Sequence, residues 1–304
     1  MASASSETPE IILLNDAHAS IALAPSAGGL LMRWTVDGKD IIHWPRDPDW
    51  TPPHRIRGGN PLLFPFIARH YVDGRLGFWK DAAGVVRAMP MHGFARDLSF
   101  DHRVDDDGLG VVLTLRDSAA TRAMYPFGFV FAVHYRLSGA TLELRLVTTN
   151  TGAAPMPYYP GHHLYFDLPV QHRGDTLLHL PDNTVQQAKP HGGVTEPVPG
   201  ATVYSLADPQ LLDRFHVLHE PGLVHLDMPW RGARVTLDLS ETACPWYAVT
   251  TWTESPDSDF YCVEPWLGLP DAINHGQGLR WLLPGQTEDA LCRLSVSTLS
   301  RDAS

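Results

Sequence analysis

The chain has 304 residues, 44% hydrophobic and 19% charged, which supplies a sizeable core and argues against global disorder. The formal net charge of −11 argues against nucleic acid and anionic membrane as general partners, while a small neutral ligand stays compatible with it. No run approaches the roughly 20 apolar residues of a membrane helix. The start, MASASSETPE, has neither a basic nor an apolar segment, so we expect residues 1–9 to form a disordered tail and not a signal peptide.

Hydrophobic residues recur mostly with a period of two, which predicts β-strands. Residues 30–44 are expected to form two strands joined across Asp37-Gly38, a dipeptide typical of tight hairpins. The same alternation predicts strands within residues 126–137, 140–150, 233–241 and 291–300. Residues 206–215 are expected to supply one or two helical turns.

The 25 glycines and 26 prolines are spread along the chain, so no linker marks a domain boundary. Many short strands separated by frequent turns are typical of a sandwich or a barrel. We therefore predict an all-β fold, with one large domain over residues 10–299 and very few short helices.

The chain contains three cysteines, Cys244, Cys262 and Cys292. An odd number without metal-ligand spacing suits reduced thiols, as in the cytoplasm, so we expect a cytoplasmic protein. None of the three has an adjacent base in the sequence, and none is expected to act as a nucleophile.

Two loops combine cationic side chains with tight turns. In the first, Arg57 precedes Gly58-Gly59. This is either a solvated surface turn or a place where the backbone approaches a ligand closely while Arg57 donates hydrogen bonds to it. In the second, His92 and Arg96 lie close together, and His92 is either a structural histidine or part of a site.

A third segment, residues 156–169, contains adjacent His162 and His163, three tyrosines and Asp167. Neighbouring side chains on a strand point to opposite faces, so only one of the two histidines is expected to share a pocket with the other candidates. No Cys/His or H-E-x-x-H spacing supports a metal centre, and no phosphate-binding or dinucleotide motif is present. We therefore expect neither a metal nor a cofactor.

A single carboxylate, Glu264, stands in the apolar segment FYCVEPWLG at residues 260–268. An ionised glutamate is costly among apolar side chains unless it is paired or its raised basicity is used. Glu264 is thus either half of a structural ion pair with an arginine or a general base.

In order and spacing, these segments together resemble the aldose 1-epimerase family, the galactose mutarotase-like proteins. The matching residues are Arg57-Gly58-Gly59-Asn60-Pro61, His92 to Arg96, Gly161 to Phe166 and Glu264-Pro265-Trp266. Asp213 and the Pro-Gly turn within residues 282–287 are weaker matches. Three positions depart from the family pattern: Asn60 replaces a branched apolar residue, Leu164 replaces proline, and His162 adds a second histidine.

The resemblance implies a β-supersandwich with a sugar cleft on one broad face. It implies that the protein interconverts the α and β anomers of an aldohexose, with Glu264 as the base and His163, aligned ahead of Tyr165-Phe166, as the acid. The implied substrate-binding residues are His92, Arg57, Arg96, Asp213 and Trp266. The aromatic residues expected either to stack on the sugar or to pack in the core are Phe64, Trp79, Tyr165 and Trp266.

One alternative lies within the family. A hexose-6-phosphate mutarotase, or glucose-6-phosphate 1-epimerase, would use Arg57 and Arg96 to clamp the phosphate, with help from Arg69 and Lys80. In either case the expected partner is a small-molecule sugar, and the protein is expected to be a monomer or a homodimer.

Two alternatives lie in other functional classes. A non-catalytic carbohydrate-binding protein would share the fold without turnover. A glycoside hydrolase or lyase would need a second carboxylate facing Glu264, for which Asp167 and Asp213 are the candidates.

Overall fold

The computed structural model describes residues 9–241 and 243–299, and it is almost entirely β. Three large sheets of four, nine and eight strands account for most of it, together with three two-stranded pairs. Residues 1–8 of the expected tail lie outside the described residues.

The four-stranded sheet has the order β1 (Ile12–Asn15), β2 (Ala19–Ala24), β3 (Leu30–Val36), β4 (Lys39–Asp40). The nine-stranded sheet has the order β10 (Asp101–Val104), β11 (Gly110–Arg116), β12 (Phe129–Ser138), β13 (Thr141–Asn150), β27 (Thr287–Thr298), β23 (Ala233–Asp238), β22 (Leu223–Met228), β17 (Leu177–His179), β20 (Val203–Ser205). The eight-stranded sheet has the order β19 (Val198–Pro199), β18 (Asn183–Gln186), β21 (Arg214–Leu218), β24 (Ala248–Trp252), β25 (Phe260–Trp266), β15 (Gly161–His162), β5 (Leu62–Leu63), with β16 (Tyr165–Asp167) also paired to β25.

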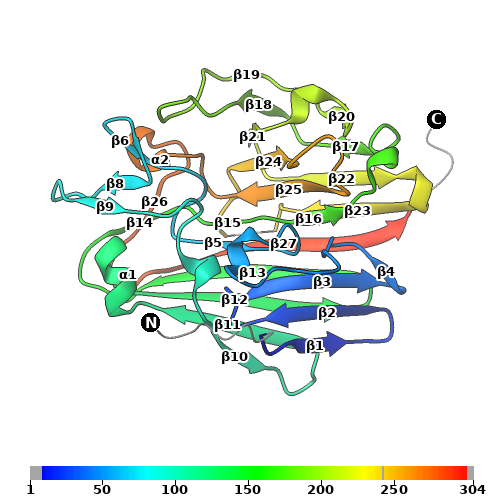
Figure 1. Ribbon diagram of the computed structural model, residues 1–304, viewed down its shortest axis with the longest axis horizontal. Helices are drawn as coiled ribbons and strands as arrows, with labels where there is room; N and C mark the ends of the chain where they lie inside the picture. The colour runs from blue at the N-terminus through cyan, green and yellow to red at the C-terminus, as the bar shows by residue number, and fades with distance from the viewer. Residues whose placement is uncertain (1–8, 242, 300–304) are drawn as a thin grey trace.

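The two-stranded pairs are β6 (Tyr71–Val72) with β7 (Arg75–Leu76), β8 (Phe78–Lys80) with β9 (Val86–Ala88), and β14 (Met156–Tyr158) with β26 (Arg280–Leu282). The described helices are α1 (Ala119–Met124), α2 (Ala272–His275) and short 3₁₀ segments at Pro53–Arg55, Ala95–Asp97, Val170–His172, Pro209–Leu211 and Pro229–Arg231. Figure 1 shows β1–β4 along one long side of the molecule and β18–β21 along the opposite side, with β25 and β27 between them. In the part of the chain that the structure describes, no helix has the length and apolar character needed to cross a membrane.

The longest strands show why the alternating residues form sheets. β12 and β13 pair antiparallel over their full length, from Phe129 opposite Asn150 to Ser138 opposite Thr141. On β13, alternate residues from Leu142 onward are buried, while those between them are only partly buried. One face of the sheet thus packs into the core and the other faces outward, as the period of two predicts.

The predicted hairpin and the predicted helical turns are both present. Asp37 and Gly38 join β3 to β4 with φ angles of 46° and 73°, the left-handed pair that a tight hairpin requires. Of the one or two helical turns predicted within residues 206–215, the structure has one, the 3₁₀ turn Pro209–Leu211. The chain then becomes strand β21 at Arg214, where Phe215 pairs with Thr250 of β24.

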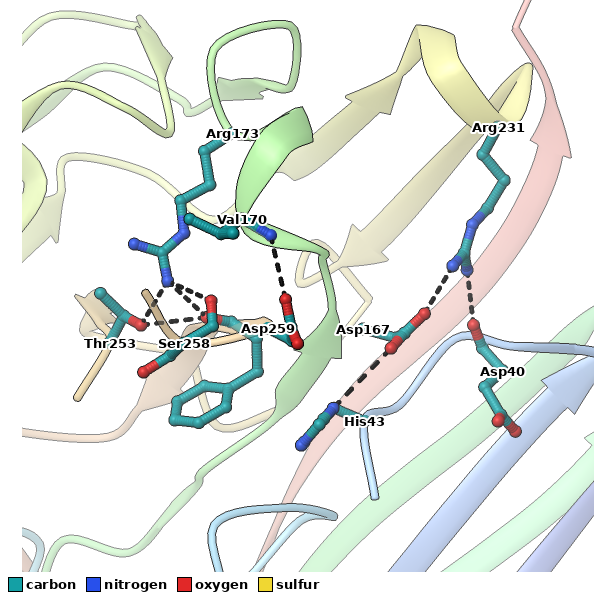
Figure 2. Close-up of polar contacts among 10 residues, drawn as sticks. Asp40, His43, Asp167, Val170, Arg173, Arg231, Thr253, Ser258 and Asp259 are labelled. Carbon is teal, nitrogen blue, oxygen red and sulfur yellow. Dashed lines mark hydrogen bonds and ion pairs between the residues drawn. The ribbon is translucent and has the colours of Figure 1, made fainter. Parts of the chain in front are cut away.

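Arg173 fastens the turn that leads into β25. Its guanidinium, almost fully buried, donates to the Thr253 hydroxyl and to the backbone carbonyls of Ser255, Ser258 and Phe260. Figure 2 shows the contacts of Arg173 with Thr253 and Ser258, near the hydrogen bond between Val170 and Asp259. Because β25 begins at Phe260, the network fixes the start of the strand that carries Glu264.

A second, partly buried network holds the end of β16. Asp167 accepts a hydrogen bond of 2.6 Å from Arg231, and its other oxygen lies 3.7 Å from Nδ1 of His43 (Figure 2). Arg231 also donates to the carbonyl of Asp40 at the end of β4. The ion pair therefore joins the four-stranded sheet to the eight-stranded one.

Candidate active site

A cleft of about 730 Å³ opens at the eight-stranded sheet, between β21, β24 and β25 and the loops around them. All seven side chains singled out in the sequence line it: Glu264, His163, His92, Arg57, Arg96, Asp213 and Trp266. Segments that are up to about two hundred residues apart in the chain thus meet in one place.

Glu264 lies at the bottom of this cleft, on β25 opposite Thr250 of β24. Only 1% of its surface is exposed, and its Oε2 has no hydrogen-bond partner among the described residues. Burial raises the pKa of Glu264 well above the ordinary value of 4.5; Trp266 offsets part of this effect, and the charge of Asp213 adds to it. Among the described residues no arginine pairs with the carboxyl, so the structural ion pair with an arginine that was considered from the sequence is not seen there.

His163 follows β15 and faces Glu264. Its Nδ1 lies 3.5 Å from Oε1 of Glu264, and its ring stacks on Tyr165 with centroids 4.8 Å apart and planes 11° apart. Burial lowers the pKa of His163 to about 3, and the positive charges of Arg96 and Arg57 act in the same direction.

The raised pKa of Glu264 and the lowered pKa of His163 favour a state in which the pair contains one proton. The buried carboxyl favours its protonated form and the buried imidazole its neutral form, because a low dielectric disfavours both charges. The ion pair Glu⁻/His⁺ contains the same single proton, so the two forms interconvert by transfer between the partners alone. The arrangement can therefore deliver a proton at one place while accepting one at another.

His92 stands next to His163, with ring centroids 5.3 Å apart, and next to Trp266. Its Nδ1 accepts the backbone N–H of Ala68 at 3.1 Å, which leaves Nε2 as the donor of the neutral ring. Burial, followed by the charge of Arg96, lowers the pKa of His92 well below 6.5, so the ring stays neutral.

The two predicted arginines differ in how they are held. Nε of Arg57 donates to Oε1 of Glu254 at 2.8 Å in a half-exposed ion pair, and its guanidinium lies 5.7 Å from the ring centre of Trp252. Arg96 donates to the carbonyl of Met91, while its buried Nε has no partner among the described residues. Each arginine therefore keeps donors that a bound ligand can use.

Backbone strain gathers around the cleft. Of the six described non-glycine residues with positive φ, four line it: Ala68, His92, Asp213 and Asp271. Such conformations cost on the order of 1–3 kcal/mol each and are found where a site requires them. Their concentration here marks the cleft as the functional region independently of the motifs.

The chain is similar to known proteins in both sequence and fold. The sequence profile of the aldose 1-epimerase family matches residues 10–295. The chain belongs to the aldose 1-epimerase family. The Slr1438 protein from Synechocystis sp. PCC 6803 is 28% identical, with a TM-score of 0.83 over 98% of this chain and 99% of that one. The galactose 1-epimerase from Lactobacillus acidophilus NCFM, 19% identical over 95% of this chain and 94% of its own, shares the fold with a TM-score of 0.72.

Two curated proteins are also similar in sequence. A Salmonella typhimurium protein named "Putative glucose-6-phosphate 1-epimerase" is 28% identical over 123 residues, which span 39% of this chain and 37% of that protein. Protein LacX (chromosomal) of Lactococcus lactis is 22% identical over 87% of this chain and 90% of its own length. The predicted family and all-β mutarotase-like fold are confirmed, and membership supports the predicted epimerase function, an isomerisation of carbohydrates. The cytoplasmic location and the oligomeric state stay predictions.

The aromatic residues expected in the epimerase cleft divide into two groups. Tyr165 and Trp266 line it, but Phe64 and Trp79 do not. Phe64 is fully buried and stacks on Phe131 at 4.2 Å, and Trp79 donates its indole N–H to the carbonyl of Met124. Both therefore belong to the core.

The glycine pair after Arg57 does not line the cleft. A Cβ on Gly59 would lie 2.3 Å from the carbonyl oxygen of Leu31, and one on Gly58 would lie 2.7 Å from Pro45. Gly59 also has a φ of 74°. The two glycines allow close packing of backbone on backbone, and this correction leaves Arg57 as the ligand-facing part of the motif.

Three other candidates lie outside the cleft. His162 is fully buried behind it, in agreement with the expectation that only one of the two histidines shares the pocket. Asp167 is occupied by Arg231 and His43, which removes it as a second carboxylate facing Glu264. Lys80 on β8 does not line the cleft either, whereas Arg69 does.

Several lining residues were missed in the sequence. Trp252 closes the site from the end of β24, and Asp271 accepts the backbone N–H groups of Tyr71 and Gly193. Residues 187–190 and Arg214 also line the cleft. The segment EPWLGLPDA places Asp271 seven residues after Glu264. This short separation is the one feature of the sequence that could have identified Asp271 as a cleft residue.

Three donor atoms of metal-binding type lie together beneath the cleft. One atom each from His163, Cys262 and Glu264 falls within 4.8 Å of the others. Burial, followed by the nearby Glu264, raises the pKa of the Cys262 thiol well above 9.0, so it stays protonated. A protonated thiol is a poor ligand, and the expectation that the chemistry needs no metal stays a prediction.

Proposed function

We propose that this chain interconverts the α and β anomers of an aldohexose in the cleft, with Glu264 as the base and His163 as the acid. The observation that carries the proposal is the buried 3.5 Å contact between Nδ1 of His163 and Oε1 of Glu264. The lowered pKa of His163 and the raised pKa of Glu264 favour a pair that contains one proton. Anomer exchange needs two proton transfers at once and no net change of charge, and such a pair is suited to it.

The reaction opens and recloses the sugar ring. Glu264 as carboxylate removes the proton from the C1 hydroxyl while imidazolium His163 protonates the ring oxygen; the C1–O bond of the ring breaks and a C1 aldehyde forms. The C1–C2 bond then rotates, and the same two transfers run backwards on the other face of the carbonyl. At the end the carboxylate and the imidazolium are restored.

Substrate binding prepares the pair for this step. In the empty site the neutral forms are favoured because neither charge is solvated. A C1 hydroxyl donating to Glu264 stabilises the carboxylate, and a ring oxygen facing His163 gives the imidazolium a hydrogen-bond acceptor. Each positioned proton transfer contributes typically about 10²–10⁴-fold to the rate.

The other lining residues bind and orient the sugar. Neutral His92 donates through Nε2 to a sugar oxygen, and Asp213 accepts from hydroxyls. Arg57 and Arg96 offer guanidinium donors. Tyr165, Trp252 and Trp266 supply flat apolar surface for a sugar ring.

A phosphorylated aldohexose is a second candidate substrate, favoured by the charge of the cleft. Five basic side chains line it: Arg57, Arg69, Arg96, Lys189 and Arg214. The lining acids are Asp213, Glu264 and Asp271, and burial raises the pKa of all three. A chain of net charge −11 thus surrounds this one cleft with cations, and bidentate arginine contacts suit a phosphate.

Anomeric exchange measured by NMR at equilibrium tests both forms of the proposal. The wild type is expected to accelerate exchange of glucose, galactose or glucose 6-phosphate, and Glu264→Gln is expected to abolish the acceleration. Asp227→Asn is the matched control, because Asp227 is also a buried carboxylate but lies outside the cleft, paired with Arg234. Sugar binding without accelerated exchange would favour a non-catalytic carbohydrate-binding protein instead.

A further inference from the structure

Asn60 stands where the family pattern has a branched apolar residue, and its side chain is fully buried. It follows the turn at Gly59, and its backbone N–H donates to the carbonyl of Leu31 at 2.7 Å, which fixes the position of the residue. Since a buried amide is costly unless it is hydrogen-bonded, the contacts of this side chain show what it is for.

Both ends of the Asn60 amide bind the same dipeptide. Oδ1 accepts the backbone N–H of His163 at 2.8 Å, and Nδ2 contacts Nδ1 of His162 at 2.9 Å. One planar group therefore fixes the backbone of His163 and, at the same time, the side chain of the residue before it.

The hydrogen bond to His162 also sets the protonation of that ring. Because an amide nitrogen only donates, Nδ1 of His162 must accept, and the proton of the neutral ring is on Nε2. Burial lowers the pKa of His162 to about 3, so the ring keeps this form near neutral pH. The ring also packs beside Trp246, with centroids 5.6 Å apart.

We propose that Asn60 is a positioning residue for the reaction: it clamps the His162-His163 dipeptide and thereby holds the imidazole of His163 against Glu264. The inference rests on the proposed role of His163 as the acid. The clamp acts on the backbone side of His163, while Tyr165 holds the opposite end of the residue by stacking on its ring. Asn60 itself does not line the cleft, so the clamp is expected to act without contacting the sugar.

Positional control of this kind has a distinctive kinetic effect. Displacing a reacting group by about 1 Å can cost on the order of 10²-fold in rate. Asn60→Leu, which removes the amide and keeps the number of side-chain heavy atoms, is therefore expected to lower kcat for anomer exchange about 10- to 100-fold. KM is expected to change little, because no sugar contact is lost.

The conservative variant Asn60→Asp is expected to retain most of the rate of anomer exchange. In Asn60→Asp, one carboxyl oxygen still accepts the backbone N–H of His163. The other oxygen forms a hydrogen bond with Nδ1 of His162, and the proton of this bond is either on the carboxyl or on the imidazole. Its kcat is expected to stay within a few-fold of wild type. Asn60→Ala, which removes the amide without adding bulk, takes the place of Asn60→Leu if the leucine variant does not fold.

Asn150→Leu is the matched control for stability. Asn150 is as fully buried as Asn60, and its amide donates to the carbonyls of Ala154 and Leu282, outside the cleft. Similar losses of stability in Asn60→Leu and Asn150→Leu, with kcat lowered only in the first, would support the proposal. Equal kcat in the two variants would overturn it.

A double-mutant cycle separates this proposal from the one on which it rests. In a His163→Gln background, Asn60→Leu is expected to lower the residual rate no further, because the group that it positions is gone. An equally large second loss would show that Asn60 acts elsewhere and would overturn the inference. If His163→Gln by itself leaves exchange unchanged, the role of His163 fails instead.

Discussion

The carboxyl of Glu264 and the imidazole of His163 lie 3.5 Å apart, and both are buried beneath a cleft rimmed by cations. Glu264 lies on β25, and His163 lies between β15 and β16. Both of these strands pair with β25 in the eight-stranded sheet. Their separation is thus set by the register of the sheet, and the anchoring of Asp167 and Arg173 at the strand ends maintains it.

His163→Gln is expected to lower kcat for anomer exchange by about 10²–10⁴-fold, because a glutamine cannot donate and recover a proton. NMR exchange measurements give the rate directly. His225→Gln is the control, since His225 on β22 contacts Thr236 and lies outside the cleft. Full activity of His163→Gln together with an inactive His162→Gln would reassign the acid to His162.

The pH dependence of exchange follows from the shared proton. The lowered pKa of His163, about 3, means that the pair takes up a second proton only in strong acid. The raised pKa of Glu264 means that the pair loses its one proton only well above pH 4.5. We therefore expect kcat/KM to be flat through mildly acidic pH and to fall on the alkaline side, where the acid is lost. A decline on acidification centred near pH 6.5 would contradict this, because it is the behaviour of an exposed histidine.

Arg57→Ala separates the two substrate classes. A hydrogen bond to a charged group contributes about 1.5–3 kcal/mol, which corresponds to roughly 10- to 100-fold in kcat/KM. A loss of this size for glucose 6-phosphate, with a much smaller loss for glucose, is expected if Arg57 binds phosphate. Arg103→Ala on β10, whose side chain is 73% exposed, is the control. Equal losses for both sugars would refute the phosphate assignment.

Asp167→Asn is expected to destabilise the fold by about 1–3 kcal/mol, since it weakens the hydrogen bond from Arg231 and the 3.7 Å contact with His43. Urea unfolding of the two proteins measures the loss. Burial alone would raise the pKa of Asp167, but the hydrogen bonds from His43 and Arg231 outweigh it and lower the pKa below 3.8. The stabilisation is therefore complete above pH 3.8 and is lost as the pH falls through the lower folded-state value. Asp107→Asn, at an exposed pair with Arg136, is expected to change stability much less.

Removal of divalent metals by EDTA is expected to leave exchange unchanged, because the proposed transfers use only Glu264 and His163. The assay compares chelator-treated and untreated enzyme, each with and without added zinc. Activity that disappears with EDTA and returns with zinc would instead identify His163, Cys262 and Glu264 as metal ligands.

The sequence predicted the strands and the seven cleft residues because both leave local patterns. Alternation on β13 and the Asp37-Gly38 turn depend on neighbouring residues alone. The motif residues were identified by the resemblance of their segments, in order and spacing, to the aldose 1-epimerase family, and the structure brings them together in one cleft.

Other features could not be predicted, because they depend on contacts between distant segments. Whether Phe64 faces a sugar or the core is decided by Phe131, which comes from another strand. The Gly58-Gly59 pair is required by the carbonyl of Leu31 and by Pro45, far away in the sequence. The helical turns predicted within residues 206–215 are limited to one, because the chain from Arg214 onward pairs with β24.

Strand β27 has a consequence for how the chain folds. It is the last described strand, yet it pairs with β13 on one side and β23 on the other, near the middle of the nine-stranded sheet. Until residues 287–298 have been synthesised, β13 and β23 both present open edges, and those edges are liable to pair with other chains. Since contacts such as Thr141 with Ser295 close very long loops, maturation is expected to be slow and to depend on emergence of this segment from the ribosome.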